Sequence, residues 1–156
     1  MLRKPKESSS LPGWLRPFNR VVIALGRLGV SLGPVSVLTL AGRRSGAPRP
    51  APITPVTLDG RRYVIAALPQ ADWARNARAA GRGELSRGRR RTTVTVHEVH
   101  DPELRRDVLR VFPVQAPGGV AFYVRLGLVD RADPEQFAAV AGRVAVFEVC
   151  DMTSQT

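Results

Sequence analysis

Residues 35–49 read VSVLTLA from Val35 to Ala41 and GRRSGAPR from Gly42 to Arg49. The first seven residues are uncharged and rich in β-branched side chains, which favour an extended strand. The next eight include two glycines, three arginines and a serine. Glycines permit a tight turn, and guanidinium groups with backbone donors suit phosphate or carboxylate oxygens. The stretch therefore predicts a strand and a basic turn, which either binds an anion or leaves its arginines in water.

The segments that follow this turn predict more strands. Residues 49–58 read as a second strand, although three prolines within it exclude a regular central ladder. Asp59-Gly60 is a hairpin signal, and residues 62–68 form the predicted return strand. We expect these three strands to follow one another in antiparallel succession.

Later segments alternate helices and strands. A helix is predicted over residues 70–80, with Asp72 at its cap or in its first turn and Gly81 and Gly83 ending it. The other predicted elements are a hairpin over 84–99, a helix over 101–112, a loop over 113–119, a weak strand over 120–124, a helix over 134–141 and a strand over 144–149. About six mostly antiparallel strands with inserted helices predict an α+β sheet or a small barrel and argue against a parallel α/β fold.

The 156-residue chain is long enough for one domain with a substantial core, which we place at residues 14–150. Residues 1–13 predict a disordered basic tail, and residues 151–156 a C-terminal tail. Between Trp14 and Leu32 apolar residues recur at helical spacing beside several arginines, which predicts an amphipathic basic helix. Its apolar face either packs on the domain or lies against an anionic membrane surface.

The formal charge of +11 is unevenly distributed, with +14 in residues 1–91 and −3 in residues 92–156. A basic front half implies an anionic partner, which could be nucleic acid, a membrane surface or a polyanionic small molecule. The densest basic cluster comprises Arg87, Arg89, Arg90 and Arg91. No stacking aromatic or groove-reading helix accompanies it, so a solvated face is favoured over nucleic-acid binding.

Several common site types find no support in the sequence. His97 and His100 would point to opposite faces of a strand, so they are poor joint metal ligands and no metal is expected. No nucleophile elbow or phosphate-binding glycine motif is present, so the sequence leaves the catalytic residues open.

The compartment is predicted from what the chain contains. Cys150 is the only cysteine, so no disulfide can form within the chain, and we expect it to be a small buried hydrophobe on the last strand. No transmembrane helix or signal peptide is evident. These features predict a cytoplasmic protein, with membrane association only through residues 14–32.

Two separated stretches resemble the deazaflavin-dependent nitroreductase family. They are residues 34–49, with the turn described above, and residues 71–76, which read ADWARN. Members of that family are split β-barrel oxidoreductases (FMN-binding split-barrel-like) that use coenzyme F420, a deazaflavin with a phosphate and an oligoglutamate tail. The resemblance covers about residues 14–150 and implies the same fold and cofactor here.

The resemblance also implies a set of site residues. The cofactor tail would lie on the turn, the deazaflavin ring against the helix and the segments before it, and the acceptor beside two further positions. The implied cofactor-binding residues are Arg43, Arg44, Ser45, Gly46, Arg49, Pro52, Leu68, Gln70, Trp73 and Asn76. The implied substrate-facing residues are Thr54, where relatives carry a tyrosine, and Tyr123.

The function implied by the resemblance is hydride transfer from reduced deazaflavin to a quinone-like or other electron-poor small molecule. Such chemistry resides in the cofactor, which explains why the sequence shows no catalytic dyad. Two alternatives stay open. One is a split-barrel protein that binds FMN or haem, and the other is a basic nucleic-acid-binding module.

Overall fold

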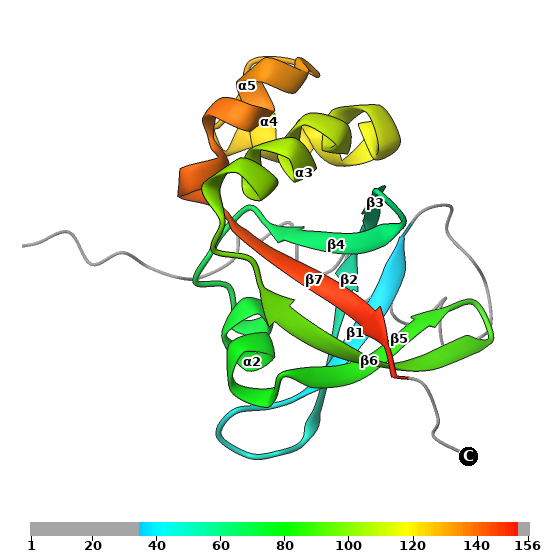
Figure 1. Ribbon diagram of the computed structural model, residues 1–156. Coiled ribbons are helices and arrows are strands. Elements are labelled where there is room, and N and C mark those ends of the chain that lie inside the picture. The colour runs from blue at the N-terminus through cyan, green and yellow to red at the C-terminus, as the bar shows by residue number, and fades with distance from the viewer. Residues whose placement is uncertain (1–34, 153–156) are drawn as a thin grey trace, which may run out of the picture.

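Seven strands form an antiparallel sheet in the computed structural model, which describes residues 35–152 (Figure 1). They are β1 (Ser36–Ala41), β2 (Pro48–Ile53), β3 (Val56–Leu58), β4 (Arg61–Ala66), β5 (Arg82–Arg87), β6 (Arg90–Glu98) and β7 (Ala145–Asp151). Their order across the sheet is β2-β1-β5-β6-β7-β4-β3. The predicted tail over 1–13, the predicted helix over 14–32 and residues 153–156 lie outside the described residues.

Helices occupy two places around the sheet. The α2 helix (Asp72–Ala80) packs beside β1 and the turn that follows it, whereas the other helices stack together over the opposite part of the sheet (Figure 1). These are α3 (Pro102–Gln115), the short 3₁₀ helix η1 (Pro117–Gly119), α4 (Val120–Arg125), α5 (Pro134–Ala139) and the 3₁₀ helix η2 (Ala141–Arg143).

The sheet is curled into a barrel with an open seam. Its two edge strands are β2 and β3, yet only Thr54 and Pro55 separate them in the chain. A link of two residues spans at most about 11 Å, so the two edges must approach each other. Pro48, Pro50 and Pro52 alternate along β2 and have no N–H to offer on its outer side. The seam therefore cannot be closed by a hydrogen-bonded ladder, and the barrel is split.

Two hydrophobic cores hold this arrangement. The barrel interior is filled by side chains such as Leu38, Val64 and Phe147, together with Ala74 and Ala77 of α2. A second core lies between the sheet and the helices α3 to α5. It contains Tyr63, Val108, Phe112, Tyr123, Phe137 and Val146. Successive residues of β4 and β7 alternate between the two cores, which explains why both strands are almost continuously buried.

The structure corrects the predicted succession of three strands. The segment over 49–58 breaks at Thr54-Pro55 into β2 and β3, which lie at opposite edges of the sheet. The β3–β4 hairpin itself is confirmed, with Asp59 at φ 51° and Gly60 at φ 75°. The prolines of this segment therefore indicated more than a non-central strand. They also marked an edge strand and the break between β2 and β3.

Two predictions in the second half of the chain were wrong. The predicted strand over 120–124 is the helix α4, in which Val120 and Tyr123, three residues apart, are buried on one face. The predicted loop over 113–119 is helical as well, because α3 continues through Pro113 to Gln115 and η1 follows. Pro113 is buried within α3, and its packing compensates for the backbone hydrogen bond that a proline cannot donate.

The prediction for Cys150 was also wrong, since it is exposed on β7. Cys150 lies on the same face of β7 as Val146. Val146 is covered by the helices α3 to α5, whereas Cys150 lies farther along the strand, next to Thr95 of β6, and is not part of that core. The remaining elements agree with the sequence-based expectations to within a few residues. The β5–β6 hairpin turns at Gly88, and Gly81 caps α2 in the left-handed conformation, while Gly83 belongs to β5.

Candidate functional site

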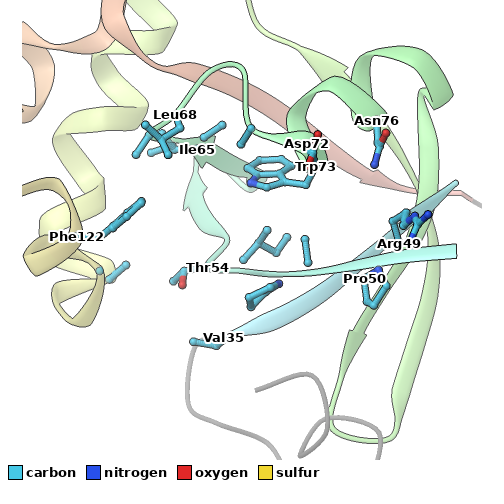
Figure 2. Close-up of a pocket in the computed structure, with 18 of the residues that line it drawn as sticks. Val35, Arg49, Pro50, Thr54, Ile65, Leu68, Asp72, Trp73, Asn76 and Phe122 are labelled. Carbon is cyan, nitrogen blue, oxygen red and sulfur yellow. The ribbon is translucent and has the colours of Figure 1, made fainter. Parts of the chain in front are cut away.

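A cavity of about 1110 Å³ lies at the open seam of the barrel. Its walls come from β2, from the end of β4 and the loop after it, from α2, and from the segment spanning the end of α3 to α4. Figure 2 shows Arg49 and Pro50 of β2 facing Trp73 and Asn76 of α2, with Phe122 of α4 at the far end. The cavity therefore has a cationic end at the β1–β2 turn and an aromatic end at α4.

The cationic end is built by the tight turn over residues 42–47. The Gly42 N–H donates to the Ala47 carbonyl at 2.8 Å, and the Gly46 N–H donates to the Gly42 carbonyl at 2.8 Å. Ser45 Oγ accepts a hydrogen bond from the Ala47 N–H at 3.2 Å. Gly46 has φ 72°, a conformation that glycine adopts without strain. These bonds fix the turn that carries Arg43 and Arg44 and leads into Arg49 of β2.

One of these arginines, Arg43, is bound to α2. Its Nη1 donates to Asn76 Oδ1 at 2.9 Å, and its backbone N–H donates to the same oxygen at 3.1 Å. Its Nη2 donates to Asp72 Oδ1 at 3.1 Å. Asp72 and Asn76 are four residues apart, so both lie on the face of α2 that meets the turn.

Arg44 and Arg49 are exposed and differ from Arg43 in their partners. Within residues 35–152 neither side chain forms an ion pair. Both line the cavity at the same end as Ser45. Two guanidinium groups without a carboxylate partner make this end of the cavity attractive to an anion.

Trp73 forms an apolar wall next to the cationic end, and a network behind it holds it in place. The Trp73 ring packs on Phe147 with centroids 5.6 Å apart, and the Arg78 guanidinium lies 5.6 Å from the centroid of Phe147. Arg78 also binds Glu98 through Nε at 2.6 Å and the Pro69 carbonyl through Nη1 at 2.8 Å. The network thus connects α2, β6, β7 and the loop that borders the cavity.

The far end of the cavity is aromatic. Tyr123 is 3% exposed and packs on Phe112 and Phe137, with both ring centroids 5.0 Å away. Burial raises the pKa of the Tyr123 phenol, so the hydroxyl stays protonated at physiological pH. Within the described part of the chain this hydroxyl has no hydrogen-bond partner, although Tyr123 lines the cavity. A neutral donor is therefore available at this end.

Most of the residues implied by the sequence meet at this cavity. Its lining includes Arg43, Arg44, Ser45, Arg49, Pro52, Thr54, Leu68, Trp73, Asn76 and Tyr123. Two predicted residues are absent from the lining. Gly46 lies at the exposed outer tip of the turn, and Gln70 is exposed, next to Ala71, which does line the cavity.

Among the lining residues that sequence reasoning missed, Asp72 and Phe122 bear most directly on the site. Asp72 had been considered only for its place at the start of α2, yet it holds Arg43. Its spacing of four residues from Asn76 was the available signal. Phe122 lines the cavity from α4 and was missed because its segment was predicted to be a strand.

The other polar groups that the sequence singled out lie away from the cavity. His97 and His100 are exposed. Arg87, Arg89, Arg90 and Arg91 surround the tip of the β5–β6 hairpin and are exposed. The densest basic cluster of the sequence therefore does not contribute to this site.

Comparison with known folds confirms the split β-barrel. One similar solved structure is described as a domain-swapped dimer, at 20% identity over 87% of this chain and 96% of that chain, with a TM-score of 0.55. An F420-H2 dependent reductase is 20% identical over 75% of this chain and 94% of that chain (TM-score 0.53). A putative pyridoxamine 5′-phosphate oxidase from Listeria innocua is 9% identical over 86% and 93% of the two chains (TM-score 0.52). At these identities the likeness concerns the fold.

The family comparison concerns the sequence itself. None of the curated proteins matches the chain. A family model described as F420H(2)-dependent quinone reductase matches residues 17–122, which include the basic turn and the whole of α2. This match confirms the expectations of an oxidoreductase and of coenzyme F420 as its cofactor. The chain belongs to the F420H(2)-dependent quinone reductase family.

Proposed function

We propose that the seam cavity binds reduced coenzyme F420, with the phosphate and glutamate tail at Arg44, Ser45 and Arg49. The observation that carries this proposal is that a single cavity joins two guanidinium groups without carboxylate partners to an apolar wall. A flexible polyanion with a flat aromatic head needs both features. The chemistry of the residues present therefore fits the cofactor of the family.

The ring of the cofactor is proposed to lie beside Trp73, Pro52 and Leu68. Trp73 is half-buried and is held from behind by Phe147, so it offers a rigid aromatic surface. Pro52 lies on the open edge of the barrel, where its missing N–H leaves no donor to be satisfied. These walls exclude water from one side of a bound ring and orient it without charge.

The acceptor is proposed to bind at the end that Thr54, Phe122 and Tyr123 line. When bound, the reduced deazaflavin supplies a hydride, and a quinone that gains this hydride and one proton becomes the hydroquinone. The Tyr123 hydroxyl can donate a hydrogen bond to a carbonyl oxygen of the acceptor. Because burial raises the pKa of Tyr123, this group orients and polarises the acceptor rather than releasing its proton.

Fluorescence titration with coenzyme F420 tests the proposal. Parallel titrations use FMN and the deazaflavin nucleoside that lacks the phosphate and the tail. We expect F420 to bind most tightly, and the reduced coenzyme to support turnover of a panel of quinones. Loss of the preference for F420 over the nucleoside in a variant without Arg44 and Arg49 places the tail at the turn. Tighter binding of FMN than of F420 would contradict the proposal.

Membrane contact and location are proposed on the sequence alone. The amphipathic pattern over residues 14–32 supports peripheral binding to an anionic membrane, which co-sedimentation with phosphatidylglycerol vesicles tests directly. Among residues 35–152 no helix is long and apolar enough to cross a membrane. A cytoplasmic location is proposed from the lone cysteine of the sequence, and nucleic acid is not proposed as a partner.

A further inference from the structure

We propose that Arg43 is a positioning residue, which anchors the β1–β2 turn to α2 so that Arg44 and Arg49 alone meet the anion. The sequence treats the three arginines of the turn as equivalent, whereas the structure separates them by their partners. The identity of the anion as the F420 tail rests on the proposed function. The mechanical role of Arg43 does not depend on that identity.

The hydrogen bonds of Arg43 hold both its main chain and its side chain. Asn76 Oδ1 accepts from the backbone N–H and from Nη1, and Asp72 Oδ1 accepts from Nη2. Asn76 is 4% exposed, so its orientation is fixed by the packing of α2. A planar guanidinium can reach both acceptors at once, whereas an ammonium group has no such fork. The contact therefore depends on the shape of arginine as well as on its charge.

The charge of Arg43 is largely compensated. Its guanidinium lies 3.1 Å from the Asp72 carboxylate, and its side chain is 22% exposed. The carboxylate itself is 80% exposed, so the ion pair contributes little stability by itself. The two bonds to the buried Asn76 oxygen carry more of the anchoring. An incoming anion therefore meets net positive charge mainly from Arg44 and Arg49.

The anchoring has a consequence for the cationic end of the cavity. The turn over residues 42–47 is otherwise held by its own internal hydrogen bonds and by the adjoining strands. Without the bonds from Arg43, the turn can move relative to α2, and the cationic end and the Trp73 wall lose their fixed separation. Cofactor affinity should then fall because the site is less ordered, although both anion-binding guanidinium groups are still present.

The test compares substitutions that keep or remove charge at each arginine. The variants are Arg43→Lys, Arg43→Gln, Arg44→Lys, Arg44→Gln and Asp72→Asn. For each variant we would measure the melting temperature without cofactor, and the F420 dissociation constant at several salt concentrations. If Arg43 is an anchor, Arg43→Lys and Arg43→Gln should weaken F420 binding by similar factors, roughly threefold to tenfold, and lower the melting temperature without cofactor.

The matched controls should behave differently. Arg44→Lys should keep most of the affinity, whereas Arg44→Gln should weaken binding and reduce its dependence on salt, with the melting temperature of the cofactor-free protein unchanged. Asp72→Asn removes a negative charge near the anion, so any weakening of F420 binding in this variant supports the anchor. Retained affinity in Arg43→Lys with a loss of salt dependence in Arg43→Gln would show instead that Arg43 contacts the anion and would overturn the inference.

The inference and the proposed function can fail separately. If the unaltered protein does not bind F420, the proposed function fails. The anchor is still tested by the melting temperatures of the cofactor-free variants. An unchanged melting temperature in both Arg43→Lys and Arg43→Gln would overturn the anchor whatever the protein binds.

Discussion

The β1–β2 turn and the tip of the β5–β6 hairpin are both rich in arginine, but the structure gives them different surroundings. Arg44 and Arg49 line a cavity beside the apolar wall formed by Trp73, and Arg43 fixes the β1–β2 turn to α2. At the hairpin, Arg91 Nη1 lies 3.7 Å from Glu84 Oε1, and the four arginines are exposed and do not line the seam cavity. The comparison teaches that a site depends on the fixed placement of charges more than on their number.

The largest expected effect distinguishes the arginines next to the β1–β2 turn from those of the β5–β6 hairpin. We expect the double variant Arg44→Gln and Arg49→Gln to weaken F420 binding roughly hundredfold, because two charge-assisted contacts are lost together. The matched control is Arg89→Gln with Arg90→Gln, which removes the same charge from the hairpin. Fluorescence titration of both proteins measures the difference. Equal losses in the two double variants would mean that overall charge, and not the turn, determines affinity.

How far the sequence predicted this difference can be seen from the residues involved. The turn was identified from its glycines and arginines, and the helix over 70–80 from Asp72 at its start and the glycines after it. The roles of Trp73 and Asn76 came from the family resemblance alone. The sequence predicted the open seam that forms the cavity only in part. The prolines of β2 indicated an irregular strand, but its place opposite β3 is set by long-range pairing of β4 with β7 and of β6 with β7.

The aromatic end of the cavity shows where local signals were misleading. Residues 120–124 contain valine, phenylalanine and tyrosine, which favour strands, yet they form α4 because Val120 and Tyr123 pack against the helical layer. The bonds from Arg43 to Asp72 and Asn76 join residues about thirty positions apart, with sequence separations of 29 and 33. The four-residue spacing of Asp72 and Asn76 places them on one helix face, but no pattern within either segment specifies Arg43 as the residue that they bind.

The second prediction concerns Gly83, where β5 passes close to β1 just before the turn. A Cβ at this position would lie 2.5 Å from the Thr39 carbonyl oxygen and 2.9 Å from Leu40 Cδ2. We expect Gly83→Ala to lower the free energy of unfolding by roughly 2 kcal/mol, because backbone atoms must shift, and to weaken F420 binding as well. Chemical denaturation and titration measure the two effects.

The control for Gly83 is Gly142→Ala, since a Cβ at Gly142 meets no atom within 4 Å. This variant should unfold at nearly the same denaturant concentration as the unaltered protein. If Gly83→Ala lowered stability without any change in F420 affinity, the approach of β1 to β5 would not be what fixes the cationic end of the cavity.

The third prediction compares one glycine in each arginine-rich turn. Gly46 has φ 72° and Gly88 has φ 59°, so alanine is strained at both positions and should cost about 1 kcal/mol of stability in each variant. The two variants should differ in function, because only the turn with Gly46 carries cavity residues. We expect Gly46→Ala to weaken F420 binding several times more than Gly88→Ala. The same affinity in both variants would indicate that the conformation of the β1–β2 turn does not matter for binding.

The smallest expected effect tests whether the hairpin arginines assist the site from a distance. Replacing Arg87, Arg89, Arg90 and Arg91 by glutamine removes positive charge that attracts a polyanion without touching it. We expect F420 to associate about twofold more slowly in low salt, and at the same rate as with the unaltered protein near 0.15 M salt, where the Debye length is about 8 Å. The dissociation rate should not change, because no contact is lost. Stopped-flow measurements at both salt concentrations separate the rates, and faster dissociation from the variant would show that the hairpin touches the cofactor.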